Sequence, residues 1–280
     1  MIILKYAADI SSWLKRLGNL SSVGFVPTMG ALHKGHLSLL QESKERCDIT
    51  VASIFVNPTQ FNNAADFNKY PVTIEQDIYL LEKNGCDILF LPDITEIYPD
   101  GTDSKIHIDL GDLENILEGK YRPGHFQGVC QVVKRLLEII QPTHLFIGQK
   151  DYQQCLVIKK LLELMNEKIE LTICPTLREE SGLAMSSRNL RLSEKQKNQA
   201  TEIYKTLLFI KQKIKYGNLN ALKKEAQQHL LKKGFKIDYV EIAEPDNLKA
   251  VDEWNGIELI ALIAAFIDDV RLIDNMLITG

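Results

Sequence analysis

The sequence lacks the features that define membrane proteins, disulfide-stabilised proteins and strongly basic proteins. Its longest apolar run, Leu259–Ile267, is less than half of the roughly 20 residues that a membrane-spanning helix needs. The five cysteines include no CxxC pair, which disfavours a zinc site or a disulfide framework and fits reduced thiols. The formal net charge is −4, so no positive field would attract nucleic acid or an anionic membrane. We therefore expect a cytoplasmic protein whose partners include neither nucleic acid nor a membrane.

The order of apolar segments predicts two domains in the 280 residues. Up to residue 174, short apolar runs alternate with amphipathic segments, with strands expected at 23–26, 49–56, 88–91, 144–147 and 169–174 and helices at 37–46, 73–84, 128–140 and 152–166. This alternation is typical of an α/β fold with a Rossmann-like parallel sheet flanked by helices, which we assign to residues 1–175. Two lysine-rich helices (193–216 and 219–233) and strands near 237–242 and 259–266 predict a smaller α+β domain at 176–280.

Ligands of parallel sheets bind at the carboxyl ends of the strands, and the segment PTMGALHKGHLSLL follows the first predicted strand end. His33 and His36 flank Gly35 where a helix is expected to begin, and helix N-termini favour phosphate. The two imidazoles could donate hydrogen bonds to an α-phosphate. No Walker loop, G-x-x-x-x-G-K-[ST], occurs in the chain. Two other interpretations stay open, namely metal ligands without a third partner and ordinary surface residues.

Two further segments place amides and a lysine after strand ends. Asn57 and Gln60 flank Pro58, and their neutral amides can bind hydroxyls or a carboxylate, although asparagine is also common in plain turns. Lys150 follows another strand and could meet phosphate as a point charge, while Gln154 lies about one helical turn beyond it. A solvated helix start would look the same.

The segment GLAMSSRN, at residues 182–189, carries two hydroxyls and a guanidinium. Ser186, Ser187 and Arg188 suit the β- and γ-phosphates of a nucleotide, since arginine binds phosphate oxygens in pairs. Its glycine would let the segment close over the site as a lid. An ordinary polar loop remains the alternative interpretation.

Taken in order, FVPTMGALHKGH, FVNPTQF, FNKYP, RPGHFQGV, GQKDYQQ, GLAMSSRN, DYVEI and RLIDN resemble the pantothenate synthetase (pantoate–beta-alanine ligase) family along nearly the whole chain. The HxGH turn also resembles the signature of the nucleotidyltransferase superfamily. The resemblance implies a Rossmann-like domain, a C-terminal lid domain and a homodimer. It implies that ATP and pantoate form pantoyl adenylate and pyrophosphate, that beta-alanine then gives pantothenate and AMP, and that Mg²⁺ accompanies the nucleotide.

Carried over by position, the resemblance also implies the site residues. It assigns ATP binding to Met29, Gly30, Ala31, Leu32, His33, Lys34, Gly35, His36, Gly148, Gln149, Lys150, Asp151, Leu177, Met185, Ser186, Ser187 and Arg188. It assigns pantoate binding to Gln60 and Gln154, with Asn57 as a weaker candidate, and it matches His36 to a proton donor; no residue is assigned as a metal ligand. We expect His33, His36 and Lys150 to stabilise charge that develops on the phosphate.

The chain departs from the family pattern at three places. Many members have glutamate where this chain has Gln149, arginine where it has Val72, and a glycine-containing turn where it has Asp268 and Asp269. Three rival functions stay open: a nucleotidyltransferase acting on a phosphate-bearing substrate, a fragment that charges tRNA, and an inactive nucleotide-binding regulator.

Overall fold

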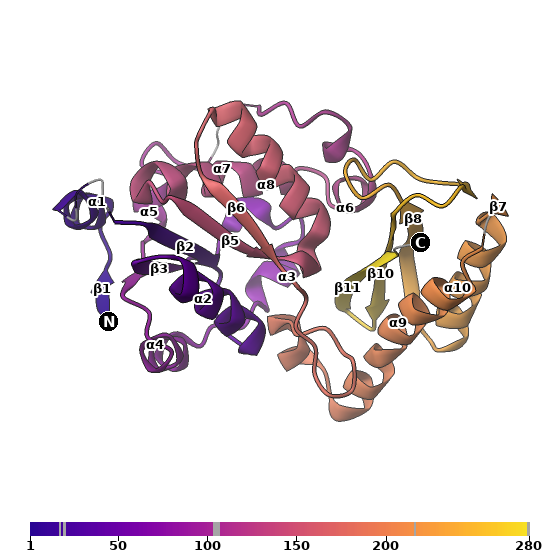
Figure 1. The fold of residues 1–280 in the computed structure, drawn as a ribbon. Coiled ribbons are helices and arrows are strands. Elements are labelled where there is room, and N and C mark those ends of the chain that lie inside the picture. Colours follow the sequence, from indigo (N-terminus) through magenta and orange to yellow (C-terminus); the bar gives the residue numbers. More distant parts are fainter. Residues whose placement is uncertain (17, 19–20, 103–106, 216, 279–280) are drawn as a thin grey trace.

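The structure, a computed structural model, describes residues 1–16, 18, 21–102, 107–215 and 217–278. Its larger sheet has six strands, β1 (Ile2–Leu4), β2 (Val23–Thr28), β3 (Ile49–Ile54), β4 (Ile88–Phe90), β5 (His144–Gly148) and β6 (Glu170–Cys174). The spatial order is β1-β4-β3-β2-β5-β6, and every pairing is parallel. Figure 1 shows β3, β2, β5 and β6 side by side. The five predicted strands are confirmed, whereas β1 was not predicted.

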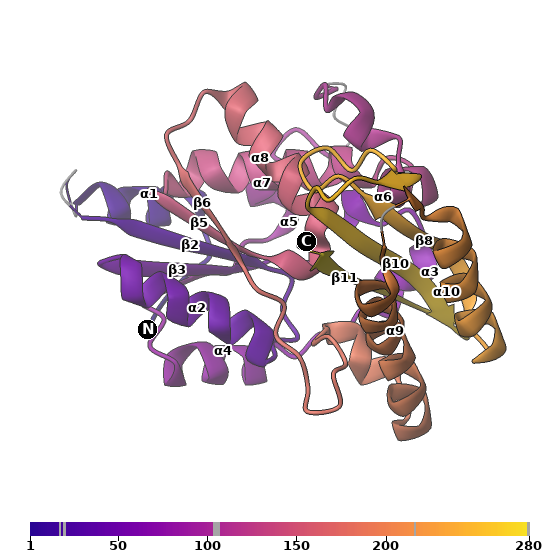
Figure 2. The same ribbon diagram turned by 45° about the vertical axis from the view of Figure 1, so that its right-hand side comes forward.

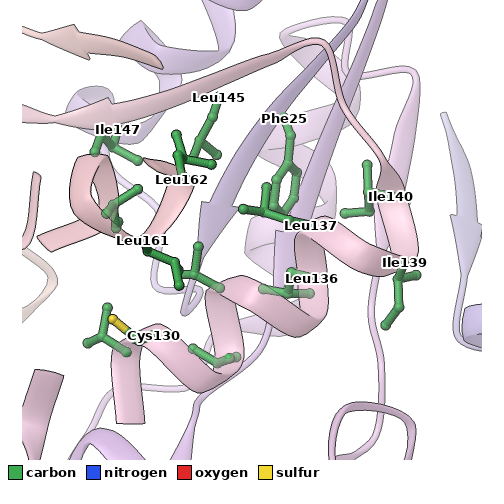
Figure 3. Close-up of a cluster of buried hydrophobic side chains, with 14 of the residues drawn as sticks. Phe25, Cys130, Leu136, Leu137, Ile139, Ile140, Leu145, Ile147, Leu161 and Leu162 are labelled. Atoms are coloured by element: carbon green, nitrogen blue, oxygen red, sulfur yellow. The ribbon is translucent and has the colours of Figure 1, made fainter. Parts of the chain in front are cut away.

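Helices cover both faces of this sheet. The longer helices are α1 (Ala7–Arg16), α2 (Lys34–Arg46), α4 (Ile74–Lys83), α7 (His125–Ile140) and α8 (Tyr152–Met165). The segments between them contain the short helices α3 (Ala64–Asn68), α5 (Ile94–Ile97) and α6 (Leu117–Tyr121) and the 3-10 turns η1 (Pro58–Gln60), η2 (Gly111–Glu114) and η3 (Gln149–Asp151). Successive strand residues point to opposite faces. Phe25 and Leu145 therefore pack with α7 and α8 (Figure 3), while Val26 and Phe146 pack with Leu39 of α2.

The C-terminal part builds a second hydrophobic core. Strands β8 (Lys236–Ala243), β10 (Leu259–Ile267) and β11 (Val270–Ile278) form an antiparallel sheet in the order β11-β10-β8, and β7 (Gly217–Asn218) pairs with β9 (Glu253–Trp254). Helices α9 (Glu194–Lys213) and α10 (Asn220–Lys232) pack on the larger of these sheets, after the 3-10 turn η4 (Ser187–Arg191). The last residue of the predicted helix 193–216 lies outside the described residues. The separate core supports the proposed domain boundary near residue 175, which stays a prediction.

The C-terminal strands and helices lie beside one end of the parallel sheet, next to α3 and α6 (Figure 2). Among the described residues, we find no helix with the length and apolar character of a membrane span.

Candidate active site

A cavity of about 220 Å³ lies at the carboxyl ends of four parallel strands. Its wall includes residues from the segments that follow β2 (Met29), β3 (Gln60), β5 (Lys150) and β6 (Leu177), together with Arg188 from the C-terminal part. A neighbouring cavity of about 300 Å³ extends between the two parts of the chain. Lys150, Asp151, Ser186 and Arg188 line both cavities, so the two spaces adjoin at this point.

The two histidines of the HxGH turn cap α2 reciprocally. The helix begins at Lys34, three residues earlier than expected, with His33 as its N-cap. His33 Nδ1 accepts a hydrogen bond from the backbone N–H of Gly35 at 3.1 Å, and His36 Nδ1 accepts one from the backbone N–H of His33 at 3.3 Å. The ring centroids are 4.0 Å apart. Both imidazoles are thus fixed by backbone donors, as in a capping box.

Burial keeps both rings neutral, and these hydrogen bonds decide which nitrogen carries the proton. Burial lowers the pKa of His33 to about 4, with a further contribution from Lys150, and burial with neighbouring His33 lowers the pKa of His36 well below its usual value. Both rings are therefore neutral at pH 7. Because each Nδ1 accepts a hydrogen bond, each ring carries its proton on Nε2. Both histidines also line the cavity.

A buried carboxylate that we did not predict holds the loop before these histidines. Asp77 of α4 accepts the backbone N–H groups of Ala31 at 2.9 Å and Leu32 at 2.8 Å, and the hydroxyl of Thr73 at 3.1 Å. The loop reaches Asp77 through Gly30, whose φ of +79° is a left-handed conformation that glycine adopts without strain. The contact spans 45 and 46 residues, so no local pattern reveals it.

The amide of Gln60 lies in the cavity wall beside Met29. Its Nε2 donates to the Met29 sulfur at 2.9 Å, and its Oε1 accepts from Asn57 Nδ2 at 3.2 Å. Asn57 Nδ2 also donates to the Gly128 carbonyl at 3.0 Å, and Asn57 Oδ1 accepts from the Tyr98 hydroxyl at 2.7 Å. Asn57 lines the cavity, but these bonds engage both ends of its amide. We interpret it as a residue that orients Gln60.

Lys150 and Gln154 line the same cavity. Lys150 Nζ is 3.5 Å from Asp151 Oδ2, and the lysine side chain is 16% exposed. Gly148 also lines the wall, and Gln154 follows in the first turn of α8. A cation and an amide therefore face the cavity from one strand end.

The GLAMSSRN segment is docked on the N-terminal part. Ser187 Oγ donates to the Ala31 carbonyl at 3.0 Å, and Arg188 Nη2 donates to Asp66 Oδ2 at 2.9 Å. Burial opposes the charge of Arg188, but Asp66 raises its pKa, so the guanidinium stays protonated. Met185 and Ser186 complete this side of the cavity.

Five predicted residues do not belong to the cavity wall: Gly30, Ala31, Leu32, Lys34 and Gln149. Ala31 and Leu32 contribute through the backbone contacts to Asp77, and Lys34 is exposed. Gln149 points instead to the C-terminal part, where its Nε2 donates to Asn275 Oδ1 at 3.3 Å.

The other departures from the family pattern lie outside the wall of the 220 Å³ cavity, although Asp269 lines the neighbouring cavity. Val72 is 68% exposed. Asp269 forms surface ion pairs with Lys69 at 2.7 Å and Arg191 at 3.0 Å, and Asp268 accepts a hydrogen bond from Gln196 at 2.6 Å. Neither departure removes a group from the cavity.

Among the described residues, His33 and His36 have no third side chain with which they could bind a metal ion. In the part of the chain that the structure describes, no group of three or more His, Cys, Asp or Glu side chains could hold a metal ion. The cavity instead combines two neutral imidazole N–H donors, an ammonium and a guanidinium beside amides. This arrangement at the ends of a parallel sheet defines a nucleotide-binding α/β enzyme.

The family follows from comparison with known proteins. A sequence model of the family described as pantoate-beta-alanine ligase matches residues 2–277, and the chain belongs to this family. It is 50% identical to a pantothenate synthetase of Cytophaga hutchinsonii over 264 residues, covering 92% of each chain. It is 42% identical to a pantothenate synthetase of Acetivibrio thermocellus over 284 residues, covering 99% of each.

Solved structures agree with this assignment. The crystal structure of a Thermus thermophilus pantothenate synthetase superposes with a TM-score of 0.91 at 37% identity and covers 100% of both chains. A pantoate-beta-alanine ligase of Francisella tularensis, complexed with beta-gamma ATP and beta-alanine, has a TM-score of 0.83 at 40% identity and covers 99% of this chain and 97% of that one. The predicted family and fold class are thus confirmed.

Proposed function

We propose that this protein is an ATP-dependent ligase that joins pantoate to beta-alanine through a pantoyl-adenylate intermediate, releasing pyrophosphate and AMP. The observation that carries the proposal is the shared cavity, in which His33, His36, Lys150 and Arg188 face one space beside Gln60. The sequence relatives named above are pantothenate synthetases, and the Francisella relative was solved with beta-gamma ATP and beta-alanine.

The first step needs donors that match the charge developing on the α-phosphate. The Nε2–H groups of His33 and His36 are such donors, because their Nδ1 atoms are already held by the backbone. Donors fixed before the reaction require no reorganisation during it. Lys150 adds a positive charge, and Arg188 suits the outer phosphates. Removing one such donor should lower kcat by roughly 10²- to 10³-fold.

The acid lies beside the nucleotide in this proposal. Gln60 Nε2 donates its hydrogen bond to the Met29 thioether, and sulfur is a weak acceptor. A carboxylate or hydroxyl oxygen of pantoate would replace that contact with a stronger hydrogen bond. Gln154 offers a second amide from α8, and holding the carboxylate in line with the phosphorus supplies the positioning that adenylation needs.

The second step requires a neutral amine and a dry site. An alkyl amine with a pKa of about 10 is only about a thousandth neutral at pH 7. The protonated Nε2 atoms of His33 and His36 cannot accept its proton while each Nδ1 is bonded to the backbone. This supports binding of the neutral amine over deprotonation by these histidines. Residues 182–189 would close the site against water, which hydrolyses acyl-adenylates.

Mg²⁺, the homodimer and the cytoplasmic location belong to the same proposal. Mg²⁺ usually keeps several waters and is held through substrate phosphates with one or two carboxylates, which fits a cavity where Asp151 stands beside the phosphate-binding cations. All five cysteines are free thiols, which fits a reducing compartment. The homodimer is supported by the family resemblance, and light scattering after gel filtration would test it.

Pyrophosphate release from ATP and Mg²⁺ tests the function. We expect release that depends on pantoate and that accelerates when beta-alanine removes the adenylate, with AMP and an amide as final products. A dinucleotide product would indicate a nucleotidyltransferase instead. Release without any acid, or no release with pantoate, would contradict the proposal. A His36→Ala variant provides the matched control for contaminating ATPases.

A further inference from the structure

Alternate side chains of strand β11 face the N-terminal part. Three segments that resemble the family but have no part in the proposed mechanism meet at this strand, namely RPGHFQGV, DYVEI and RLIDN. Arg271 and Asn275 are four residues apart, so both point to the same side of the strand. Both bond to residues of the N-terminal part. They reach two different halves of the active site.

Asn275 holds the turn that carries Lys150. This side chain is 3% exposed, and its Nδ2 donates to the backbone carbonyls of Gln149 at 3.0 Å and Lys150 at 2.9 Å. Its Oδ1 accepts from Gln149 Nε2 at 3.3 Å. One buried amide of the C-terminal part thus fixes the backbone from which the phosphate-binding lysine projects. A glutamate at position 149 could not make the last of these bonds, because its carboxylate has no donor.

Arg271 holds Glu118 of α6 with both arms of its guanidinium. The distances are 2.7 Å from Nη1 to Oε2 and 2.8 Å from Nη2 to Oε1, and the Tyr239 hydroxyl also donates to Oε1 at 2.8 Å. Burial would raise the pKa of Glu118, but Arg271 and the nearby Arg122 lower it to about 2. Glu118 is therefore an anion at neutral pH, held between cations from both parts of the chain.

A directed series of contacts continues from Glu118 to Gln60. Arg122 Nη1 lies 3.8 Å from Glu118 Oε2 and 3.1 Å from His125 Nε2. Burial and Arg122 lower the pKa of His125 to about 3, so the ring is neutral. Its Nδ1 lies 2.8 Å from the Gln60 carbonyl, which can only accept, so Nδ1 carries the proton and Nε2 accepts from Arg122. Arg122 Nη2 also donates to the same carbonyl at 3.4 Å.

We propose that β11 aligns the two halves of the active site independently: Asn275 positions Lys150 for the nucleotide, and Arg271, acting through Glu118, Arg122 and His125, positions Gln60 for the acid. Both are positioning residues, since neither lines the 220 Å³ cavity that holds the proposed site, although Arg271 lines the adjoining cavity of about 300 Å³. The inference rests on the proposed function, which supplies the two substrates. Under this alignment, ATP and pantoate both bind well only when the C-terminal domain is docked on the N-terminal part.

The test compares two variants by steady-state pyrophosphate release. Arg271→Met should raise the KM for pantoate about tenfold, the ratio that about 1.4 kcal/mol produces, and should change the KM for ATP by less than about twofold. Asn275→Ala should do the reverse, because it frees the Lys150 turn and leaves the Gln60 contacts in place. Alanine is used there because aspartate would add a charge near the triphosphate.

A control separates alignment from general destabilisation. Lys223→Met removes a partly buried ion pair to Glu241 and Asp252, all within the C-terminal part. Like the two test variants it should lower the melting temperature, but it should leave the ratio of the two KM values unchanged. Should Arg271→Met or Asn275→Ala not fold, Arg271→Lys and Asn275→Ser retain part of each contact and should show the same divergence in smaller measure.

Equal effects of both variants on both KM values would overturn the inference, as would no effect on either. Failure of the proposed function is distinguishable, because wild-type protein would then release no pyrophosphate with pantoate. In that case ATP titration calorimetry decides: Asn275→Ala should weaken ATP binding while Arg271→Met leaves it unchanged, and equal binding by both variants refutes the alignment.

Discussion

Replacing Asp77 by asparagine tests whether a buried carboxylate sets the geometry of the HxGH turn. The carboxylate accepts three hydrogen bonds, two of them from the backbone N–H groups of Ala31 and Leu32. An asparagine has one acceptor oxygen, so its NH₂ must face at least one of those N–H donors. The loss of one hydrogen bond to a charged acceptor should lower the free energy of unfolding by about 1.5–3 kcal/mol.

The same change should lower turnover, because the loop leads directly into His33 and His36. A misplacement of about 1 Å costs roughly 10²-fold in rate, so we expect kcat to fall between about 10- and 100-fold. Urea unfolding and pyrophosphate release measure the two effects on one preparation. Thr73→Val is the matched control, since it removes only the third bond to Asp77 and should cost about 1 kcal/mol with kcat within about twofold.

A kcat of Asp77→Asn within about threefold of wild type, well short of the rate loss that misplacement causes, would refute a role of Asp77 in placing the two histidines. The same role would be contradicted if Thr73→Val reduced kcat as strongly, because the effect would then come from general loosening of α4.

Three further variants test the neighbouring groups. Gly35→Ala would place a Cβ 2.9 Å from the His33 ring, so the ring must rotate off its backbone donor, and we expect kcat to fall about tenfold in the pyrophosphate assay. Folding lowers the pKa of His33 from 6.5 to about 4, so the unfolded chain binds more protons in that window and the free energy of unfolding should fall as pH decreases through it. Urea titrations at several pH values between 4 and 6.5 measure this dependence, and the free energy of unfolding should change less steeply with pH in His33→Gln than in wild type. An equal pH dependence in the two proteins would contradict the assigned neutral ring. Arg188→Lys keeps the charge but loses the fork, so the KM for ATP should rise about tenfold and the KM for pantoate much less, whereas equal rises would argue against a phosphate role.

The regular part of the fold could be predicted because its signals are local. Short apolar runs predicted the five strands β2 to β6, and helical spacing predicted α7 and α8 with boundaries close to those observed. Strand β11 escaped prediction because Arg271, Asp274 and Asn275 interrupt its apolar pattern. All three are used in contacts with other segments, so their polarity reflects the tertiary structure and not an exposed loop.

The candidate site was predictable to the extent that its residues follow strand ends. That rule located His33, Gln60 and Lys150 on one cavity. The earlier start of α2 was missed because a capping box normally uses serine or threonine with glutamate or glutamine, and here two histidines take both roles. Asp77 was missed because its partners are distant in sequence.

The central claim is that residues from separate strand ends surround one triphosphate beside an amide-lined pocket for an acid. A crystal structure with a non-hydrolysable ATP analogue and pantoate tests it most directly. We expect phosphate oxygens within hydrogen-bonding distance of Nε2 of His33 and His36 and of Lys150 and Arg188, with the pantoate carboxylate at Gln60. A nucleotide bound elsewhere, or phosphates that contact none of these four side chains, would contradict the account.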